Sequence, residues 1–292
     1  MIAPLVIAVV LNWNRRDDTL ACVVSLLEST YQPLRVLVCD NGSVDDTPAA
    51  VRSAYPSVEV LELGYNRGFA GGANAGLRYA LAAGAEYVLA LNNDTFVEPT
   101  MIERLVEAAA PDVGIVAPLI YYATAPDTIW SAGGVRSRWT LEQIHDLRGQ
   151  RDTGIWPSTL KRDFAPGCAM LLSRVVLETV GLFDERFFMY YEDSDLCLRV
   201  RRAGHRILLV PAAHMWHKVA TSSGGIGSSA ERYAMARSSV LFFRKHVRGW
   251  QWAIVAPFRL GSAAKTTARL LWRGRPAAAL AYWRGLRDGW RM

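Results

Sequence analysis

Two groups of polar residues have types and spacing that suit chemistry. The first is Asn92-Asn93-Asp94, which follows an apolar run, Tyr87–Leu91, typical of a buried strand. A carboxylate at such a rigid edge is suited to hold Mg²⁺ or Mn²⁺ against the oxygens of a nucleoside diphosphate, so Asp94 is the candidate metal ligand. The alternative is that Asp94 caps the helix expected after Glu98-Pro99.

The second group is an acidic cluster that follows the aromatic run Phe187–Tyr191. Glu192, Asp193 and Asp195 lie within four residues at the expected start of a helix, where acids gain from the helix dipole. At 100° per residue, Glu192 and Asp195 share one side of that helix and Asp193 lies on another. One acid can therefore face an acceptor as a general base while the others brace the helix.

Two histidines, His214 and His217, follow an expected strand at Ile207–Val210. A lone histidine is more often a satisfied core residue than a ligand. A histidine at a strand end of the same sheet could nevertheless reach a metal held by Asp94.

The N-terminal third, whose elements must position these residues, alternates strand and helix patterns. This alternation predicts an α/β fold with a mainly parallel sheet covered on both faces, in which ligands bind beyond the carboxyl ends of the strands. Strands are expected at Leu5–Leu11, Leu34–Cys39, Val58–Leu63, Tyr87–Leu91 and Val113–Ala117, and helices at 16–29, 45–54, 70–83 and 99–109.

Polar, turn-forming residues follow four of these strands, and they converge on one edge of the sheet. They are Asn12-Trp13-Asn14, Asp40-Asn41-Gly42-Ser43, Gly64-Tyr65-Asn66-Arg67-Gly68 and Asn92-Asn93-Asp94. Later segments are less regular. Short antiparallel strands and loops are expected over 118–165, a strand at Phe164–Leu172, helices at 174–181 and Glu192–Ala203, and a Gly/Ser-rich loop over 218–229.

Composition limits the class of protein. A chain of 292 residues that is 51% hydrophobic can bury a full core, as one large domain or one domain with an appendage. The four cysteines are isolated, which indicates reduced core residues rather than disulfides or a zinc site. The run Ile2–Leu11 is too short to span a bilayer and lacks the basic start of a signal peptide. Elsewhere in the chain there is no apolar run long enough to predict a membrane span.

The positive charge is concentrated at the C-terminal end. Between Arg244 and Met292 there are eleven Lys/Arg and one acid, and this stretch holds five of the ten tryptophans, although the net charge of the whole chain is only +6. Basic residues interleaved with Trp and Leu are typical of helices that lie in an anionic lipid headgroup layer. The alternative is a solvated basic helix packed on the body. No nucleic-acid-binding module is recognisable, so nucleic acid is not expected as a partner.

Several motifs, in order over roughly residues 4 to 220, resemble family 2 glycosyltransferases of the GT-A fold, particularly the rhamnosyltransferase-like members. The matching stretches are Val38–Asp45, Asn66–Asn74, Leu91–Asp94, Pro166–Met170, Phe183–Glu185 and Phe188–Leu196. In the third stretch two amides, Asn92 and Asn93, stand where acids are usual, which leaves Asp94 as the carboxylate of that motif.

The resemblance implies roles for individual positions. Asp193 matches the catalytic base and Glu192 its acidic neighbour, while Asp94 and His217 match ligands of a divalent cation, Mg²⁺ or Mn²⁺; His214 has no match. Asp40 matches the acceptor for the imide of a uracil or thymine base. The implied nucleotide-sugar-binding residues are Asn12, Asn14, Asp40, Asn41, Gly42, Arg67, Gly68, Asn74, Asn92 and Asn93.

The expected protein is therefore an inverting glycosyltransferase with dTDP-rhamnose as first and a UDP-sugar as second choice of donor. The acceptor would be a hydroxyl of a lipid-linked or cell-surface glycan, at the cytoplasmic face of the cell membrane. The GT-A domain is expected over 1–225, with a nucleotide-sugar half (1–117) and an acceptor half (118–225), followed by a basic amphipathic helical extension (226–292). A nucleotidyltransferase and a non-catalytic nucleotide-sugar-binding scaffold remain as alternatives.

Overall fold

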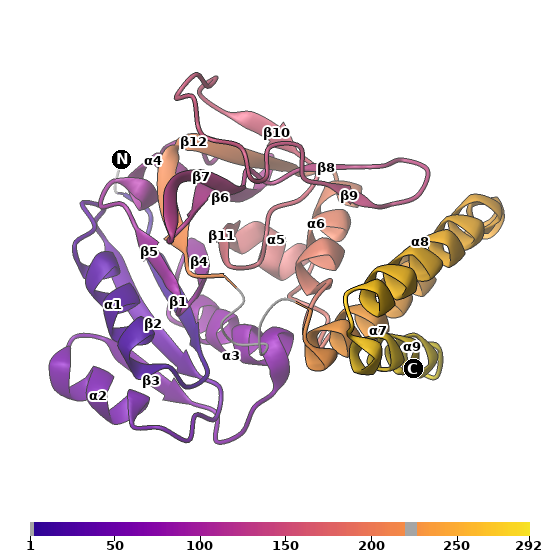
Figure 1. Ribbon diagram of the computed structural model, residues 1–292. Coiled ribbons are helices and arrows are strands. Elements are labelled where there is room, and N and C mark those ends of the chain that lie inside the picture. The colour runs from indigo at the N-terminus through magenta and orange to yellow at the C-terminus, as the bar shows by residue number, and fades with distance from the viewer. Residues whose placement is uncertain (1–2, 220–226) are drawn as a thin grey trace. The chain divides into compact units, whose positions relative to one another are not determined.

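A mainly parallel sheet forms the centre of the α/β part of the chain (Figure 1). The structure is a computed structural model that describes residues 3–219 and 227–292. Within these residues the sheet has ten strands, and β8 (Val135–Arg136) pairs separately with β9 (Gln143–Ile144). The sheet strands are β1 (Val6–Asn12), β2 (Leu34–Asp40), β3 (Glu59–Glu62), β4 (Tyr87–Asn92), β5 (Thr95–Val97), β6 (Val113–Tyr122), β7 (Ala125–Ser131), β10 (Leu160–Arg162), β11 (Ala169–Ser173) and β12 (Arg206–His217).

The strand order across the sheet is β10-β12-β6-β11-β4-β1-β2-β3, with β5 paired to β12 and β7 paired to β6. Strands β4, β1, β2 and β3 are mutually parallel, and so are β6 and β12. Strand β11 runs antiparallel between β4 and β6. The predicted parallel arrangement is thus confirmed for the nucleotide-sugar half, and β11 divides it from the β6–β12 pair.

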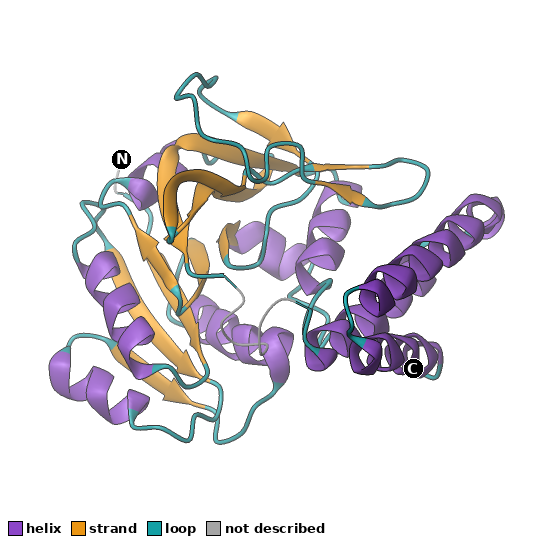
Figure 2. Cartoon of the chain, in the orientation of Figure 1, coloured by secondary structure: helices purple, strands orange, loops and turns teal. Residues whose placement is uncertain are grey.

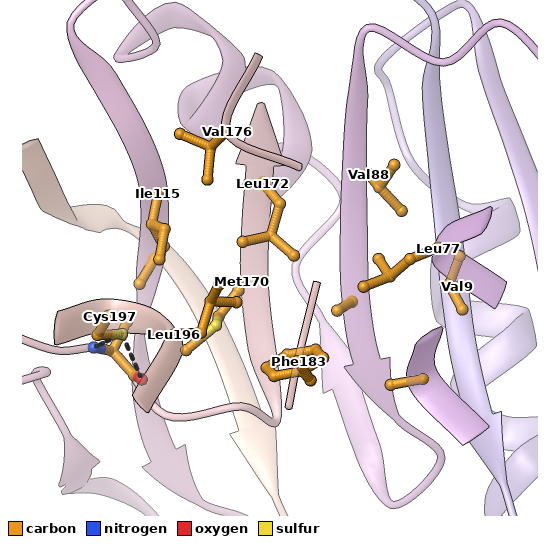
Figure 3. Close-up of a cluster of buried hydrophobic side chains, with 14 of the residues drawn as sticks. Val9, Leu77, Val88, Ile115, Met170, Leu172, Val176, Phe183, Leu196 and Cys197 are labelled. Atoms are coloured by element: carbon orange, nitrogen blue, oxygen red, sulfur yellow. Dashed lines mark hydrogen bonds between the residues drawn. The ribbon is translucent and has the colours of Figure 1, made fainter. Parts of the chain in front are cut away.

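Helices cover both faces of this sheet (Figure 2). They are α1 (Arg16–Leu27), α2 (Thr47–Ala54), α3 (Gly68–Ala82), α4 (Met101–Glu107), α5 (Arg174–Thr179) and α6 (Glu192–Arg202). Alternate residues of β1 point to opposite faces: Val6, Ala8 and Val10 pack with α1, α2 and α4, whereas Ile7 and Val9 pack with α3, α5 and α6. Figure 3 shows the second of these cores, in which Leu77 and Phe183 pack beside the sheet.

Several predicted boundaries differ from the structure. Strand β6 continues through Tyr122, and β12 continues from Arg206 to His217 across a bulge between Val210 and His214. His214 and His217 therefore lie within a strand, where the prediction placed them after one. Strand β11 begins at Ala169 rather than Phe164, because Pro166 lacks the N–H that a central strand would need.

All four cysteines are buried core residues, as expected from their spacing. Part of the predicted Gly/Ser-rich loop, residues 220–226, lies outside the described residues. Of the helices in the described part of the chain, none combines the length and apolarity needed to cross a bilayer.

The chain divides into two compact units. The first holds the sheet and helices α1 to α6, over residues up to 135, 145–186 and 192–219. The described part of the second comprises residues 136–144, 187–191 and 227–292, with helices α7 (Ser229–His246), α8 (Trp252–Trp272) and α9 (Pro276–Trp290). Helix α7 begins after the N-cap Ser228, whose hydroxyl accepts from the backbone N–H of Glu231, while the Glu231 carboxylate accepts from the N–H of Gly227, the residue before the cap.

Candidate active site

The carboxyl ends of β1, β2 and β4 lie side by side. In the sheet register Asn12 is opposite Asp40, and Leu11 is opposite Asn92. Asn12 and Asp40 are almost fully buried, and so is Asn93 in the turn after β4. The polar residues predicted to follow successive strands therefore meet at one edge of the sheet.

The Asp40 carboxylate is held by short hydrogen bonds. Its Oδ1 accepts from Asn12 Nδ2 at 2.6 Å and from the Ser43 hydroxyl, and its Oδ2 accepts from the backbone N–H of Ser43 at 3.0 Å. A carboxylate oxygen has two lone pairs, so Oδ2 can accept a second hydrogen bond. Asp40 is thus preorganised as an acceptor, the property needed to recognise an imide N–H.

Asn93 connects the ends of β1 and β4. Its Nδ2 donates to Asn12 Oδ1 at 2.9 Å, to the Thr19 hydroxyl at 2.9 Å and to the carbonyl of Asn14 at 3.2 Å. Asn14 adopts a positive φ of 59°, and its Oδ1 accepts from the backbone N–H of Val44. These amides hold the loops after β1, β2 and β4 in one network.

The loops after β2 and β3 are joined in the same way. Asn41 Oδ1 accepts from the backbone N–H of Arg67 at 2.9 Å, and Asn41 Nδ2 donates to the carbonyl of Gly68 at 2.9 Å. Gly42 has a φ of +77° and lies so close to the Tyr65 backbone that a Cβ there would overlap it. The Arg67 guanidinium stacks over the exposed Tyr65 ring at 4.8 Å and remains exposed itself.

Asn92 and Asn74, the two remaining residues predicted to bind the nucleotide sugar, differ in their surroundings. Asn92 is half-buried, and none of the hydrogen bonds among the described residues involves its side chain. Asn74 is 1% exposed, and its amide donates to the Phe183 carbonyl at 2.9 Å and accepts from the Phe183 N–H at 3.0 Å. A third bond runs from Asn74 to Glu185 at 2.9 Å. Asn74 therefore holds the segment before α6, and does not join the other amides.

Asp94 and His217 form a buried pair. The Oδ1 atom of Asp94 lies 3.1 Å from His217 Nε2, and both side chains are less than 10% exposed. The Trp130 ring meets the imidazole edge-to-face, with the ring centres 4.7 Å apart. Burial alone would lower the pKa of His217, but the adjacent Cys168 thiol and the hydrogen bond to Asp94 outweigh it and raise the pKa to about 10.

The chemistry of this pair suits a divalent cation. Asp94 Oδ1 and His217 Nε2 are joined by a hydrogen bond, and a cation bound by both atoms would replace the proton between them. Imidazole nitrogen and carboxylate oxygen are both suitable ligands for Mn²⁺. Among the described residues no group of three or more His, Cys, Asp or Glu side chains is placed to hold a metal. Donor phosphates and water would have to supply the remaining ligands.

Asp193 lies in the first turn of α6 with an oriented carboxylate. Its Oδ2 accepts from the backbone N–H of Gly167 at 3.1 Å, and its Oδ1 accepts from that of Ser194 at 2.6 Å. Asp193 is half-buried, whereas Glu192 is 6% exposed and Asp195 is fully buried. Of the three acids in this turn, Asp193 is the one that solvent or an acceptor can reach.

The other two acids in the first turn of α6, Asp195 and Glu192, have different surroundings. Asp195 pairs with Arg199 at 2.8 Å, and Arg199 also donates to the carbonyls of Val180 and Leu182. This ion pair braces the helix, as the spacing predicts. Burial and the charge of Asp193 raise the pKa of Glu192 well above its usual 4.5.

The candidate base and the candidate cation pair flank one short segment. Asp193 accepts from the N–H of Gly167, and the next residue, Cys168, places its thiol beside His217. The carbonyl of Cys168 also accepts from the backbone N–H of Asn92, at 3.2 Å. The Pro166–Met170 motif therefore connects α6 to the end of β4 and brings the two predicted groups together.

Sequence reasoning gave three residues of this site no role of their own, although it placed Ser43 in a polar turn at this edge. Ser43 and Thr19 complete the network around Asp40 and Asn93, and Trp130 covers His217. Ser43 follows Asp40-Asn41-Gly42, so a local turn signal was available for it. Trp130 is 87 residues before His217 in the chain, and nothing in its neighbourhood indicates this contact.

Known proteins match much of this chain. Residues 7–181 match the family described as Glycosyl transferase family 2, a range that ends before α6. An N-acetylglucosaminyl-diphospho-decaprenol L-rhamnosyltransferase of Mycobacterium tuberculosis is 32% identical over 256 residues, covering 78% of this chain and 80% of that protein. A dTDP-rhamnosyl transferase of Shigella flexneri is 25% identical over 249 residues, covering 82% of this chain and 80% of that protein.

A solved structure shares the fold. It is a mannosyltransferase of Pyrobaculum calidifontis in complex with GDP-Man and Mn²⁺, with a TM-score of 0.62, 19% identity, and coverage of 99% of this chain and 88% of that one. The predicted GT-A fold is confirmed. The alternative of a nucleotidyltransferase is set aside, because the matching family and these relatives are glycosyltransferases.

Proposed function

The chain belongs to the family 2 glycosyltransferases, and we propose on this basis that it transfers rhamnose from dTDP-rhamnose to an acceptor hydroxyl with inversion. The acceptor is a lipid-linked or cell-surface glycan, and UDP-sugars are the second class of donor. Two relatives named as rhamnosyltransferases support the sugar, and the name of one of them includes a diphospho-decaprenol acceptor.

Asp193 is the general base of this reaction. The observation that carries this proposal is its accessibility: the carboxylate is half-buried and oriented by two backbone N–H groups, while Glu192 and Asp195 are buried. The acceptor oxygen forms a bond to the anomeric carbon as the bond to the diphosphate oxygen breaks, and Asp193 takes the hydroxyl proton. General-base catalysis contributes roughly 10²–10⁴ to such a rate. Glu192 is the buried acidic neighbour of the base.

The donor binds at the edge formed by β1, β2 and β4. Asp40 accepts the imide N–H of the base through Oδ2, and the exposed Arg67 guanidinium offers positive charge to the diphosphate. Asn92 presents a side chain free of hydrogen bonds with described residues. Asn12, Asn14, Asn41, Gly42, Gly68 and Asn93 shape the loops around the donor, and Asn74 acts through the Phe183 segment.

Asp94 and His217 hold a divalent cation at this site. When bound, Mg²⁺ or Mn²⁺ neutralises the charge that develops on the leaving diphosphate. The pairing of a carboxylate and an imidazole side chain supports this assignment, and a solved structure of the same fold contains Mn²⁺ with a nucleotide sugar.

The place of action is the cytoplasmic face of the cell membrane, where the chain is a peripheral protein. The C-terminal stretch from Arg244, with eleven basic residues and one acid, supports binding to an anionic membrane surface. A lipid-linked acceptor would be presented at that surface.

A donor screen tests the proposed function. Purified protein with Mn²⁺ is mixed with dTDP-rhamnose, UDP-glucose or GDP-mannose, and both the melting temperature and the release of nucleoside diphosphate are measured. We expect the largest thermal shift and the fastest release with dTDP-rhamnose. A shift without release in the presence of glycan acceptors would favour the non-catalytic scaffold, and a preference for GDP-mannose would overturn the donor assignment.

A further inference from the structure

The outer face of α8 is apolar and exposed along the whole helix. Leu260 is 70% exposed, Leu271 54%, and Trp272 at the C-terminal end 86%. Intervals of three and four residues place the exposed apolar positions on one side of the helix. These positions, the α8 stripe, are Ala253, Pro257, Leu260, Ala264, Ala268 and Leu271. Single exposed leucines are ordinary, but a continuous stripe indicates a binding surface.

The fold of the second unit does not need this stripe. The opposite side of α8 carries its buried residues, Val255, Ala263 and Leu270, and the last two pack with Ala278 and Tyr282 of α9. Within the second unit α8 is thus fixed through this buried side. Its outer side is available to a partner.

Positive charge borders the stripe. Lys265 and Arg269 are exposed and four residues apart, so they lie on the same side of α8, and residues 252–272 include no acid. Arg259 has a different role, because it donates to the Ser239 hydroxyl at 2.9 Å and stacks over Phe243 in α7. The exposed part of α8 therefore combines an apolar stripe with a cationic edge.

The combination of an apolar stripe with a cationic edge distinguishes among three possible partners. A second copy of the chain would bring the same cations together without compensating acids. A nucleic acid would pair with Lys265 and Arg269 but would leave the leucines in water. The headgroup layer of an anionic bilayer satisfies both features, because phosphates face the cations and acyl chains receive Leu260, Leu271 and the Trp272 ring.

We propose that α8 is the element that binds the membrane, lying in the headgroup layer of an anionic bilayer with the α8 stripe toward the acyl chains. This inference deepens the proposed function and rests on it only in placing the acceptor at a membrane. It assigns the surface to one helix of the basic C-terminal stretch, and within that helix to one face.

Vesicle binding by the full chain tests this assignment. Phosphatidylcholine vesicles, with and without about one third phosphatidylglycerol, are sedimented with wild type and with Leu260→Gln/Leu271→Gln. We expect wild type to bind the anionic vesicles. The double variant should bind them at least about tenfold more weakly. The matched control is Leu280→Gln in α9, a leucine that is also 54% exposed, which should bind as wild type. An equal loss in this control would overturn the assignment to α8.

Two further experiments identify what binds to the α8 stripe. Lys265→Gln/Arg269→Gln should remove the preference for anionic over neutral vesicles. Brominated lipids should quench the fluorescence of wild type more than that of Trp272→Phe. Absence of vesicle binding, together with a dimer in sedimentation velocity that Leu260→Gln/Leu271→Gln converts to a monomer, would show a second copy as the occupant and overturn the proposal.

The same samples separate this proposal from the proposed function. Donor turnover is measured with a water-soluble glycan acceptor, which does not require a membrane, and Leu260→Gln/Leu271→Gln should retain the wild-type rate. Vesicle binding without turnover in wild type would contradict the proposed glycosyl transfer and leave the α8 assignment supported. Turnover without vesicle binding would contradict the α8 assignment and leave the transfer supported.

Discussion

Asp94 and His217 are 123 residues apart in the chain, yet their side chains face each other at 3.1 Å. The backbone sets this separation. Strand β5 starts directly after Asp94 and pairs with the end of β12, so that Thr95 lies opposite His217, and the N–H of Lys218 donates to the carbonyl of Asp94. The pair is therefore as rigid as the sheet, which suits a site that must present two ligands to a cation.

Asp94→Asn should weaken cation binding. The amide keeps the size of the side chain but removes the negative charge beside His217, so we expect Mn²⁺ affinity in the presence of dTDP to fall by more than about tenfold. Isothermal titration of Mn²⁺ into the protein with dTDP measures this change.

The matched control for this experiment is Glu98→Gln. Glu98 Oε2 lies 3.4 Å from His214 Nδ1, a second carboxylate–histidine pair of similar spacing that the family resemblance does not connect to metal. Its substitution should leave Mn²⁺ affinity unchanged. If Glu98→Gln weakens Mn²⁺ binding as much as Asp94→Asn does, the cation does not bind at Asp94.

Asp193→Asn should abolish most turnover while keeping donor affinity. The amide can accept from the Gly167 and Ser194 N–H groups through one oxygen only and cannot take the acceptor proton, so we expect a loss of roughly 10²–10⁴ in kcat. Steady-state release of dTDP measures the rate, and calorimetry with dTDP measures the affinity. Glu192→Gln, the same change one residue earlier, should lose far less of kcat, because the buried Glu192 side chain does not reach the acceptor. An equal loss in both variants would contradict the assignment of the base.

The sequence predicts the positions of site residues well where a regular strand or helix sets them. Residues that end successive parallel strands must share one edge, so Asn12, Asp40 and Asp94 could be placed together without coordinates. The helical period likewise separates Asp193 from its buried neighbours. In both cases the geometry follows from a regular element whose period is known.

Long-range contacts account for what the sequence does not predict. The position of Trp130 on His217 depends on how β7 pairs with β6, where the register shifts twice. The segments 136–144 and 187–191 group with the C-terminal helices because of tertiary packing. The Asn74 amide binds the backbone of Phe183, 109 residues away, and neither local turn chemistry nor periodicity indicates that contact.

Glu192→Gln should stabilise the protein increasingly as the pH rises. Burial, with a further contribution from Asp193, raises the folded-state pKa of Glu192 above the unfolded value of 4.5. A carboxyl with a raised folded pKa contributes stability fully below the unfolded pKa, and this contribution is lost as pH rises toward the folded pKa. The glutamine stays neutral at every pH, so its advantage in free energy of unfolding should grow as the pH rises above the unfolded pKa of 4.5.

Urea denaturation across this range measures the effect, and Glu185→Gln provides a control of opposite sign. Hydrogen bonds from Asn74 and Arg78 lower the pKa of Glu185. Its contribution is present above the unfolded pKa, so Glu185→Gln should destabilise the protein at neutral pH and have less effect in acid. A pH-independent difference between Glu192→Gln and wild type would show that folding does not raise the pKa of Glu192.

Gly42→Ala should destabilise the donor-binding loop more than Gly64→Ala. Both glycines have a φ of +77°, so both substitutions introduce the strain of a left-handed backbone, about 1–2 kcal/mol. A Cβ at Gly64 meets nothing within 4 Å, whereas one at Gly42 would overlap the Tyr65 backbone. The Gly42 variant should therefore show the larger fall in melting temperature and also a loss of dTDP affinity, since Asn41 and Ser43 flank this position. Equal falls in melting temperature would mean that the Tyr65 loop moves aside without cost, which would contradict the close approach of the two loops as a source of stability.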